Sequence, residues 1–140
     1  MQNQVWFFDF CRARLSVKSR RSNMRLWKTV SNCMVLLDDE NVYLAAVYLI
    51  DAFAKTTAHS RVEPQDVIAV CTHLARCIVF DLNETLMWYC TICGTRCLFQ
   101  QQKTVLQALD YRTMLTTKHL DDIRRRLIES QSADMITSLE

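Results

Sequence analysis

The chain has 140 residues, half of them apolar, and a formal net charge of +2. A chain of this length and composition forms one domain with a core of its own, which excludes a disordered protein. It contains one glycine and one proline. Turns between β-strands and phosphate-binding loops need glycine repeatedly, because glycine accepts backbone angles that other residues avoid. We therefore predict an all-α fold and exclude β-sandwiches, β-barrels and glycine-rich nucleotide sites.

The charge is unevenly distributed along the chain. Between Cys11 and Lys28 there is no acidic residue, and there are seven basic ones, namely Arg12, Arg14, Lys18, Arg20, Arg21, Arg25 and Lys28. A basic arm of this kind can act as a nuclear-import signal or contact nucleic acid. The alternative, which we favour, is the solvated face of a helix.

The cysteines and the hydropathy of the chain indicate its compartment. The apolar run Val5–Phe10 is interrupted by Asp9 and lacks the features of a signal peptide. No apolar stretch reaches the roughly 18 residues that a membrane span needs, so we expect no membrane partner. We interpret the seven cysteines as reduced thiols and predict an intracellular protein of the nucleus, the cytoplasm or both.

The first half of the chain predicts three elements. Residues 1–20 are expected to form an accessory helix and the basic arm, with an exposed aromatic cluster made of Trp6, Phe7, Phe8 and Phe10. The alternative is that these rings pack on the rest of the domain. From residue 23 to residue 37, apolar side chains recur every three or four positions, which predicts an amphipathic helix. The helix predicted for residues 39–55 is apolar almost all round, as is typical of a central helix, and the acids Asp38–Glu40 precede it as caps.

The second half predicts three more helices after a loop at Thr56–Arg61. Glu63 and Pro64 open the first of these, because proline loses no hydrogen bond in the first turn of a helix. Its buried stripe is predicted as Val67, Val70, Cys71, Leu74, Cys77 and Ile78. A short helix from residue 84 to about residue 93 is expected to end at Gly94, and another covers residues 98–111. A last amphipathic helix is expected around residues 120–128, followed by a polar stretch from Glu129.

Three of these segments carry motifs that resemble the cyclin box. Residues 41–53 contain Leu-Ala-Ala-Val-Tyr-Leu-Ile-Asp-Ala-Phe, similar to the second-helix pattern of that family, Leu-Ala-x-x-Tyr-[Ile/Leu]-Asp-x-Phe. Residues 21–27 resemble the first-helix pattern Arg-x-x-Leu-x-x-Trp, and residues 104–111 the fifth-helix pattern Val-Leu-x-x-Leu-x-[Phe/Tyr]. The resemblance implies a single, divergent five-helix cyclin-box-like domain over residues 21–111, as in some viral cyclin homologues, with residues 112–140 as a C-terminal amphipathic helix and tail.

The resemblance implies a regulatory protein without enzymatic activity or cofactor. Such a protein binds a cyclin-dependent kinase or a related partner and modulates the cell cycle or transcription. Cyclins that activate kinases carry a lysine near the end of the third helix and a glutamate in the fifth, which hold the regulatory helix of the kinase. Aligning the motifs puts Phe80 and Gln102 at these positions, with Arg76 as the nearby cation. The implied kinase-binding interface therefore consists of Phe80, Gln102 and Arg76.

The resemblance also implies roles for the first helix of the box. In the family, an arginine of this helix pairs with an aspartate of the second, which here are Arg21 and Asp51. Met24 and Trp27 match the apolar floor of a peptide-docking patch, although Arg20 stands where an apolar residue is usual. Plain core packing of Met24 and Trp27 is the alternative.

Two alternative functions stay open. Cys90, Cys93 and Cys97 have a spacing that suits zinc, with His73 or His119 as distant candidates for the fourth ligand; the alternative is that these cysteines are small core residues. The chain would then be a zinc-stabilised helical interaction domain. In the other alternative it is a kinase-independent cyclin-box scaffold in transcription, which uses its basic arm. Because no motif singles out a catalytic cysteine, we do not expect an enzyme.

Overall fold

The computed structural model describes residues 3–80, 98–110 and 117–139. Over these residues the chain forms six α-helices, two short 3-10 helices and no strand, which confirms the all-α prediction. None of the helices in these ranges is long and apolar enough to cross a membrane. The helix predicted from residue 84 to residue 93, Gly94 and the three clustered cysteines lie outside the described residues. The cyclin-box arrangement itself stays a prediction.

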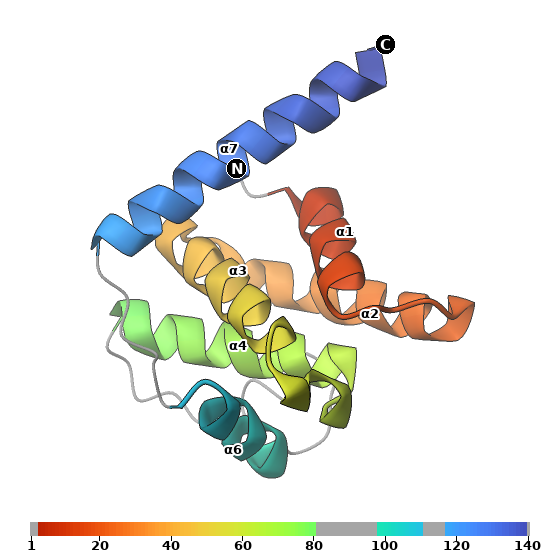
Figure 1. Cartoon of the computed structure of the whole chain (residues 1–140), viewed down its shortest axis with the longest axis vertical. Helices are drawn as coiled ribbons and strands as arrows, with labels where there is room; N and C mark the ends of the chain where they lie inside the picture. Colours follow the sequence, from red (N-terminus) through yellow and green to blue (C-terminus); the bar gives the residue numbers. More distant parts are fainter. Residues whose placement is uncertain (1–2, 81–97, 111–116, 140) are drawn as a thin grey trace.

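Side-chain caps set several of the element boundaries. The elements are α1 (Gln4–Arg14), α2 (Arg20–Cys33), η1 (Met34–Leu37), α3 (Glu40–Ala54), η2 (Thr57–Arg61), α4 (Pro64–Phe80), α6 (Phe99–Ala108) and α7 (Thr117–Leu139) (Figure 1). Asp39 caps α3 and Pro64 opens α4, as predicted. Ser19 caps α2 and so starts it before residue 23. The predicted loop 56–61 contains η2, and α7 continues through the polar stretch beyond Glu129, where we expected it to end.

The core forms around two enclosed helices, α3 and α4. Every residue from Asp66 to Ala75 of α4 is buried, and α4 packs against α2, α3 and α6. Nine residues of α3 are buried, and this helix has α4 on one side and α1 and α7 on the other (Figure 1). The central position predicted for residues 39–55 is therefore confirmed, and α4 is enclosed to a similar degree. The last two residues of its predicted stripe, Cys77 and Ile78, are only half-buried.

The first helix, α1, belongs to the core. Phe7 and Cys11 are fully buried, and the Phe7 ring lies 5.5 Å from that of Tyr43 in α3. The other aromatic side chains of α1 are half-buried and make ring contacts: Trp6 with Phe10, and Phe8 with Trp27 of α2. The expected N-terminal helix is therefore present, but its aromatic cluster is not exposed and packs on the rest of the domain, which was the alternative. Burying a large apolar side chain is worth about 1.5–3 kcal/mol, which favours covering these rings.

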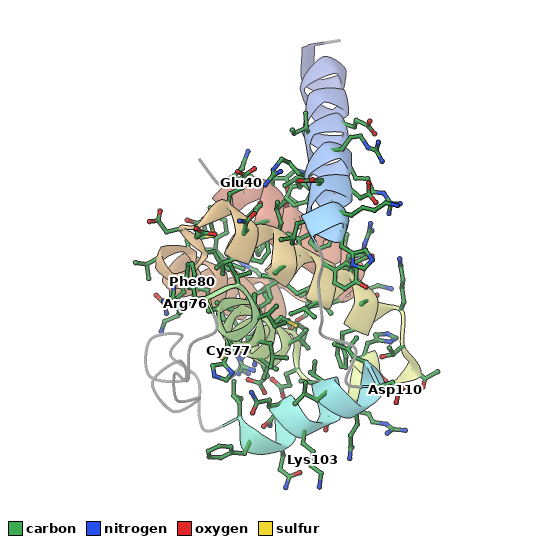
Figure 2. All side chains as sticks on the ribbon, turned by 90° about the vertical axis from the view of Figure 1, so that its left-hand side faces the viewer. Glu40, Arg76, Cys77, Phe80, Lys103 and Asp110 are labelled. Atoms are coloured by element: carbon green, nitrogen blue, oxygen red, sulfur yellow. The ribbon has the colours of Figure 1, made fainter. Side chains whose placement is uncertain are left out.

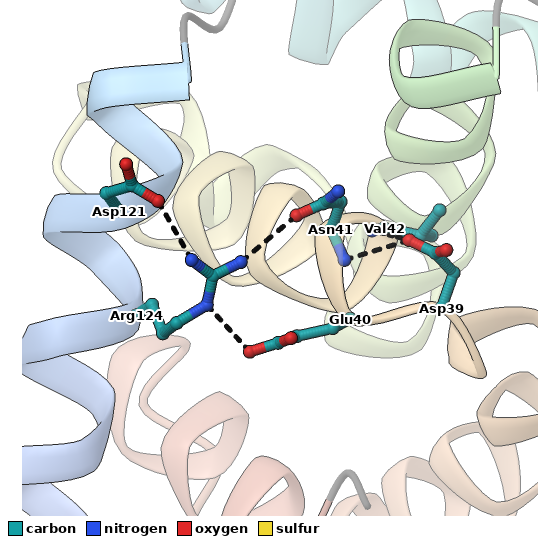
Figure 3. A network of polar contacts seen from close by, with 6 residues as sticks. All are labelled: Asp39, Glu40, Asn41, Val42, Asp121 and Arg124. Atoms are coloured by element: carbon teal, nitrogen blue, oxygen red, sulfur yellow. Dashed lines mark hydrogen bonds and ion pairs between the residues drawn. The ribbon is translucent and has the colours of Figure 1, made fainter.

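The last helix, α7, is attached to the start of α3 by one arginine. Nε of Arg124 lies 2.7 Å from a carboxylate oxygen of Glu40, and one terminal nitrogen lies 2.8 Å from Asp121 (Figure 3). The other terminal nitrogen donates to the side-chain oxygen of Asn41 at 3.3 Å. Ile123 and Leu127 add apolar contact with the core. These contacts hold the N-terminal half of α7, whereas its C-terminal half extends beyond the other helices (Figure 1).

Candidate functional site

The residues that the cyclin resemblance assigned to kinase binding lie on or against one face of α4. His73, Arg76, Cys77 and Phe80 are spaced by three and four residues, so they share this face near the C-terminal end of the helix. Figure 2 shows Arg76, Cys77 and Phe80 at this end of α4. The packing of α6 on α4 adds Gln102, which contacts His73. We call the six residues His73, Arg76, Cys77, Phe80, Phe99 and Gln102 the α4–α6 surface.

The cation of this surface, Arg76, is held by its own chain. Its guanidinium carbon lies 5.3 Å from the centre of the Phe80 ring, which is a cation–π contact. One of its terminal nitrogens also donates to the carbonyl of Leu36 in η1, at 3.2 Å. Arg76 therefore fixes the Phe80 ring at the surface, and it links α4 to η1.

Two aromatic rings of the α4–α6 surface are exposed. Phe80 is 39% exposed at the end of α4, and Phe99, the first residue of α6, is 59% exposed. Exposed large apolar groups that adjoin ordered polar side chains are typical of interaction sites. Sequence reasoning did not find Phe99, because it lies outside the family motif; its position at a helix start after a cysteine-rich stretch gave no signal.

A buried histidine connects the two helices of the surface. His73 is 7% exposed, and the side-chain nitrogen of Gln102 lies 2.9 Å from its Nδ1. On the other side of the ring, the sulfur of Cys77 lies 3.5 Å from Nε2. Because an amide nitrogen only donates, Nδ1 of His73 is the acceptor in the contact with Gln102. Gln102 is thus held in place by a histidine of α4.

Sequence reasoning missed the pair formed by His73 and Cys77. The signal was the spacing of four between His73 and Cys77, which puts both on one face. A thiol beside an imidazole is the pair from which cysteine nucleophiles are built.

The predicted ion pair between Arg21 and Asp51 is wrong. The carboxylate of Asp51 lies 2.8 Å from Nε of Arg14 and 2.9 Å from Nζ of Lys55. Arg21 is exposed on α2 and, among the described residues, forms no ion pair with Asp51. The reason is that α1 packs on α3 and so brings Arg14 to Asp51. Burial by itself would raise the pKa of Asp51, but hydrogen bonds and charge from Lys55 and Arg14 lower it.

The outer side of α2 carries the predicted docking patch and most of the basic arm. Met24 is 64% exposed, and Trp27 is 40% exposed with its ring edge-on to Phe8 at 5.1 Å. Met24 is therefore not a core residue. Arg12 and Arg14 are in ion pairs. The other five basic residues are exposed, and we call them the basic face: Lys18, Arg20, Arg21, Arg25 and Lys28.

The structure bears on the metal alternative only in part. Cys90, Cys93 and Cys97 lie outside the described residues. Within the described ranges, no three His, Cys, Asp or Glu side chains gather closely enough to hold a metal ion. His119 of α7 stacks on Tyr48 of α3, with ring centres 6.3 Å apart.

The α4–α6 surface is suited to recognition of another protein. Its two exposed rings offer apolar area, and Arg76 and Gln102 offer polar groups whose positions are already fixed. Comparisons of the chain with protein-family models, with curated proteins and with solved structures give no match.

Proposed function

We propose that this chain is a cyclin-like regulatory protein that docks a cyclin-dependent kinase, or a related protein partner, on the α4–α6 surface. Docking would modulate the cell cycle or transcription. The cyclin-like motifs support the choice of partner. Two of them lie in α2 and α3, and both helices pack against α4, which carries most of this surface. The observation that carries the proposal is the exposure of Phe80 at the end of α4 and of Phe99 at the start of α6, two helices that pack together.

The chemistry of this interface differs from that implied for kinase-activating cyclins. Phe80 and Gln102 stand where those proteins have a lysine and a glutamate. Docking would bury aromatic area and form hydrogen bonds, instead of forming two ion pairs with the partner. Because salt screens exposed charges but not apolar contact, we expect binding to depend weakly on ionic strength.

The experiment is a binding titration of the purified chain against a panel of purified cyclin-dependent kinases. Removing an aromatic side chain from the centre of an interface typically weakens the binding free energy by about 2 kcal/mol or more. Phe80→Asp and Phe99→Asp should therefore each weaken binding at least tenfold. Val5→Asp is the matched control, because Val5 is 59% exposed on α1. It should bind as the natural chain does.

Two results would contradict the proposal. One is the absence of binding to every kinase of the panel at micromolar concentration, with the fold verified by circular dichroism. The other is equal binding by all three variants. A kinase assay on the complex then separates activation from inhibition, since the proposal covers regulation in either direction.

A second candidate function is a kinase-independent scaffold that contacts nucleic acid through the basic face. The observation that favours it is the exposure of all five cations on or next to α2, which has no acidic residue. Cations in the first turn of a helix oppose the helix dipole, so Arg20 and Arg21 do not serve the stability of α2.

A further inference from the structure

A cleft of about 730 Å³ lies between α1, α3 and α7. It is on the far side of α3 from α4 and α6 (Figure 1), so it is separate from the α4–α6 surface. Its volume falls within the range of about 300–1,000 Å³ that is usual for small-molecule sites. Its lining residues come from α3, which forms the floor, and from α1 and α7, which pack on α3 and form the walls.

The walls of the cleft combine apolar and aromatic side chains with charged ones. Trp6 and Phe10 of α1 stack on each other, with ring centres 5.2 Å apart and planes at 12°. Opposite them, Ile123 and Leu127 of α7 line the cleft, and both are partly buried. Tyr48 of the floor stacks on His119. Flat rings and aliphatic side chains on facing walls suit a ligand with a flat apolar body.

The charged groups of the cleft leave an excess of positive charge. The Asp51 carboxylate is shared by Arg14 and Lys55, so two cations face one acid. The second acid, Asp122, is already paired with Arg125 at 3.1 Å, and Arg125 is not a lining residue. Arg126 lines the cleft and is exposed, and none of the ion pairs among the described residues includes it.

The cations of the cleft keep donors for a ligand. An ammonium group has three N–H donors, and Nζ of Lys55 is paired with one carboxylate oxygen of Asp51. The Lys55 side chain is 74% exposed. Arg126 supplies a second cation, on α7, and it is exposed. The two cations lie apart, because Lys55 follows the last residue of α3 whereas Arg124, in the same turn of α7 as Arg126, pairs with Glu40 at the start of α3. An anionic group can therefore lie at Arg126, which solvent reaches easily.

We propose that the cleft between α1, α3 and α7 binds a small organic anion with a flat aromatic body. Its anionic group, a carboxylate, sulfonate or phosphate, lies at Arg126, and its body lies between Trp6 and Phe10 on one wall and Leu127 on the other. This binding is independent of the docking function proposed above, and neither test depends on the other.

The test uses two fluorescent dyes that differ in charge. 8-Anilinonaphthalene-1-sulfonate is an aromatic anion, and N-phenyl-1-naphthylamine is the same ring system without the sulfonate. The purified full chain should bind the anion with at least tenfold higher affinity than the neutral dye. Arg126→Glu should weaken binding of the anion at least fivefold and leave the neutral dye unchanged.

The matched control is Lys103→Glu, which makes the same change in net charge. Lys103 is exposed on the outer side of α6, far from the cleft (Figure 2). The Lys103→Glu variant should bind both dyes with the same affinity as the natural chain. Equal affinity of the natural chain for the two dyes would overturn the proposal. So would an equal loss of affinity for the anionic dye in Arg126→Glu and Lys103→Glu. Circular dichroism of Arg126→Glu verifies that α7 keeps its helix.

Discussion

At the residue scale, Asp51 shows how tertiary packing decides the partner of a charged group. It lies inside an otherwise apolar helix, and its side chain is 29% exposed between Arg14 and Lys55. The sequence predicts that such a carboxylate needs a cation, and this is correct. Its spacing from Lys55, one turn later in the same helix, was the local signal for one partner. Arg14 could not be predicted, because its approach depends on how α1 crosses α3.

This arrangement predicts unequal effects of two arginine substitutions. Arg14→Met keeps most of the side-chain stem but removes the charge next to Asp51, so it should lower the free energy of unfolding by about 0.5–1 kcal/mol, as for other partly exposed ion pairs. Arg21→Met, the matched control, should change it by less than about 0.3 kcal/mol. Urea denaturation at pH 7 measures both. A larger effect of Arg21→Met would restore the ion pair that the sequence suggested.

The same carboxylate gives a dependence on pH. The pKa of Asp51 is lowered in the folded state, so the ionised side chain stabilises the fold above its unfolded pKa of about 3.9. This contribution is lost as the pH falls through the lower, folded pKa. The difference in stability between the natural chain and Asp51→Asn should therefore be largest at pH 7 and shrink below about pH 4. A difference in stability that stays constant down to pH 2 would contradict this role of the ionised Asp51 side chain.

At the element scale, the helices with local stop and start signals were predictable. Asp39 and Pro64 mark the beginnings of α3 and α4. The apolar spacing in α2 was misleading, because Met24 and Trp27 of the expected stripe are exposed. The buried residues of this helix are Leu26, Thr29, Val30 and Cys33. The length of α7 was not predictable from periodicity, because residues 129–134 carry only one apolar side chain, that of Ala133. Propensity gave no clear signal either, since Glu129 and Gln131 favour a helix but alternate with serine.

The basic face of α2 gives a prediction at this scale. If it contacts nucleic acid, the chain should bind a fluorescein-labelled DNA duplex with an affinity that falls steeply as salt rises, because phosphate contacts release counterions. Arg20→Glu combined with Arg21→Glu should remove most of this binding.

The control for the basic face is a second charge-reversed pair, Arg61→Glu combined with Lys103→Glu. Both residues are exposed and lie on other elements, η2 and α6. This pair should bind the duplex nearly as well as the natural chain. Equal loss in both double variants would show that only net charge matters, and would count against the basic face as a site.

At the scale of the whole molecule, the sequence predicts the central helices but not what covers them. The aromatic cluster of α1 was visible, yet it could not show that Phe7 is buried against Tyr43 of α3. The α4–α6 surface was predicted in part, because Arg76, Phe80 and Gln102 came from an alignment of motifs. The contact of Gln102 with His73 depends on the packing of two helices that are 29 residues apart at this point.

The position of α1 in the core leads to a prediction about thiol reactivity. Cys11 of α1 and Cys71 of α4 are both fully buried. Burial raises the pKa of both thiols, and the neighbouring Cys71 raises that of Cys11 further. Because thiolates are the reactive form, both should react with a disulfide reagent only when the molecule unfolds globally. Cys77, which is half-buried at the surface, should react in the folded state.

Labelling followed by peptide mass spectrometry, at increasing urea, measures this for each cysteine. If α1 is part of the cooperative core, Cys11 and Cys71 give the same free energy of opening, equal to the global free energy of unfolding. If α1 is an accessory helix that detaches by itself, Cys11 becomes reactive at lower urea than Cys71. The comparison distinguishes the two because both thiols start from full burial, so any difference between them comes from the unfolding of α1.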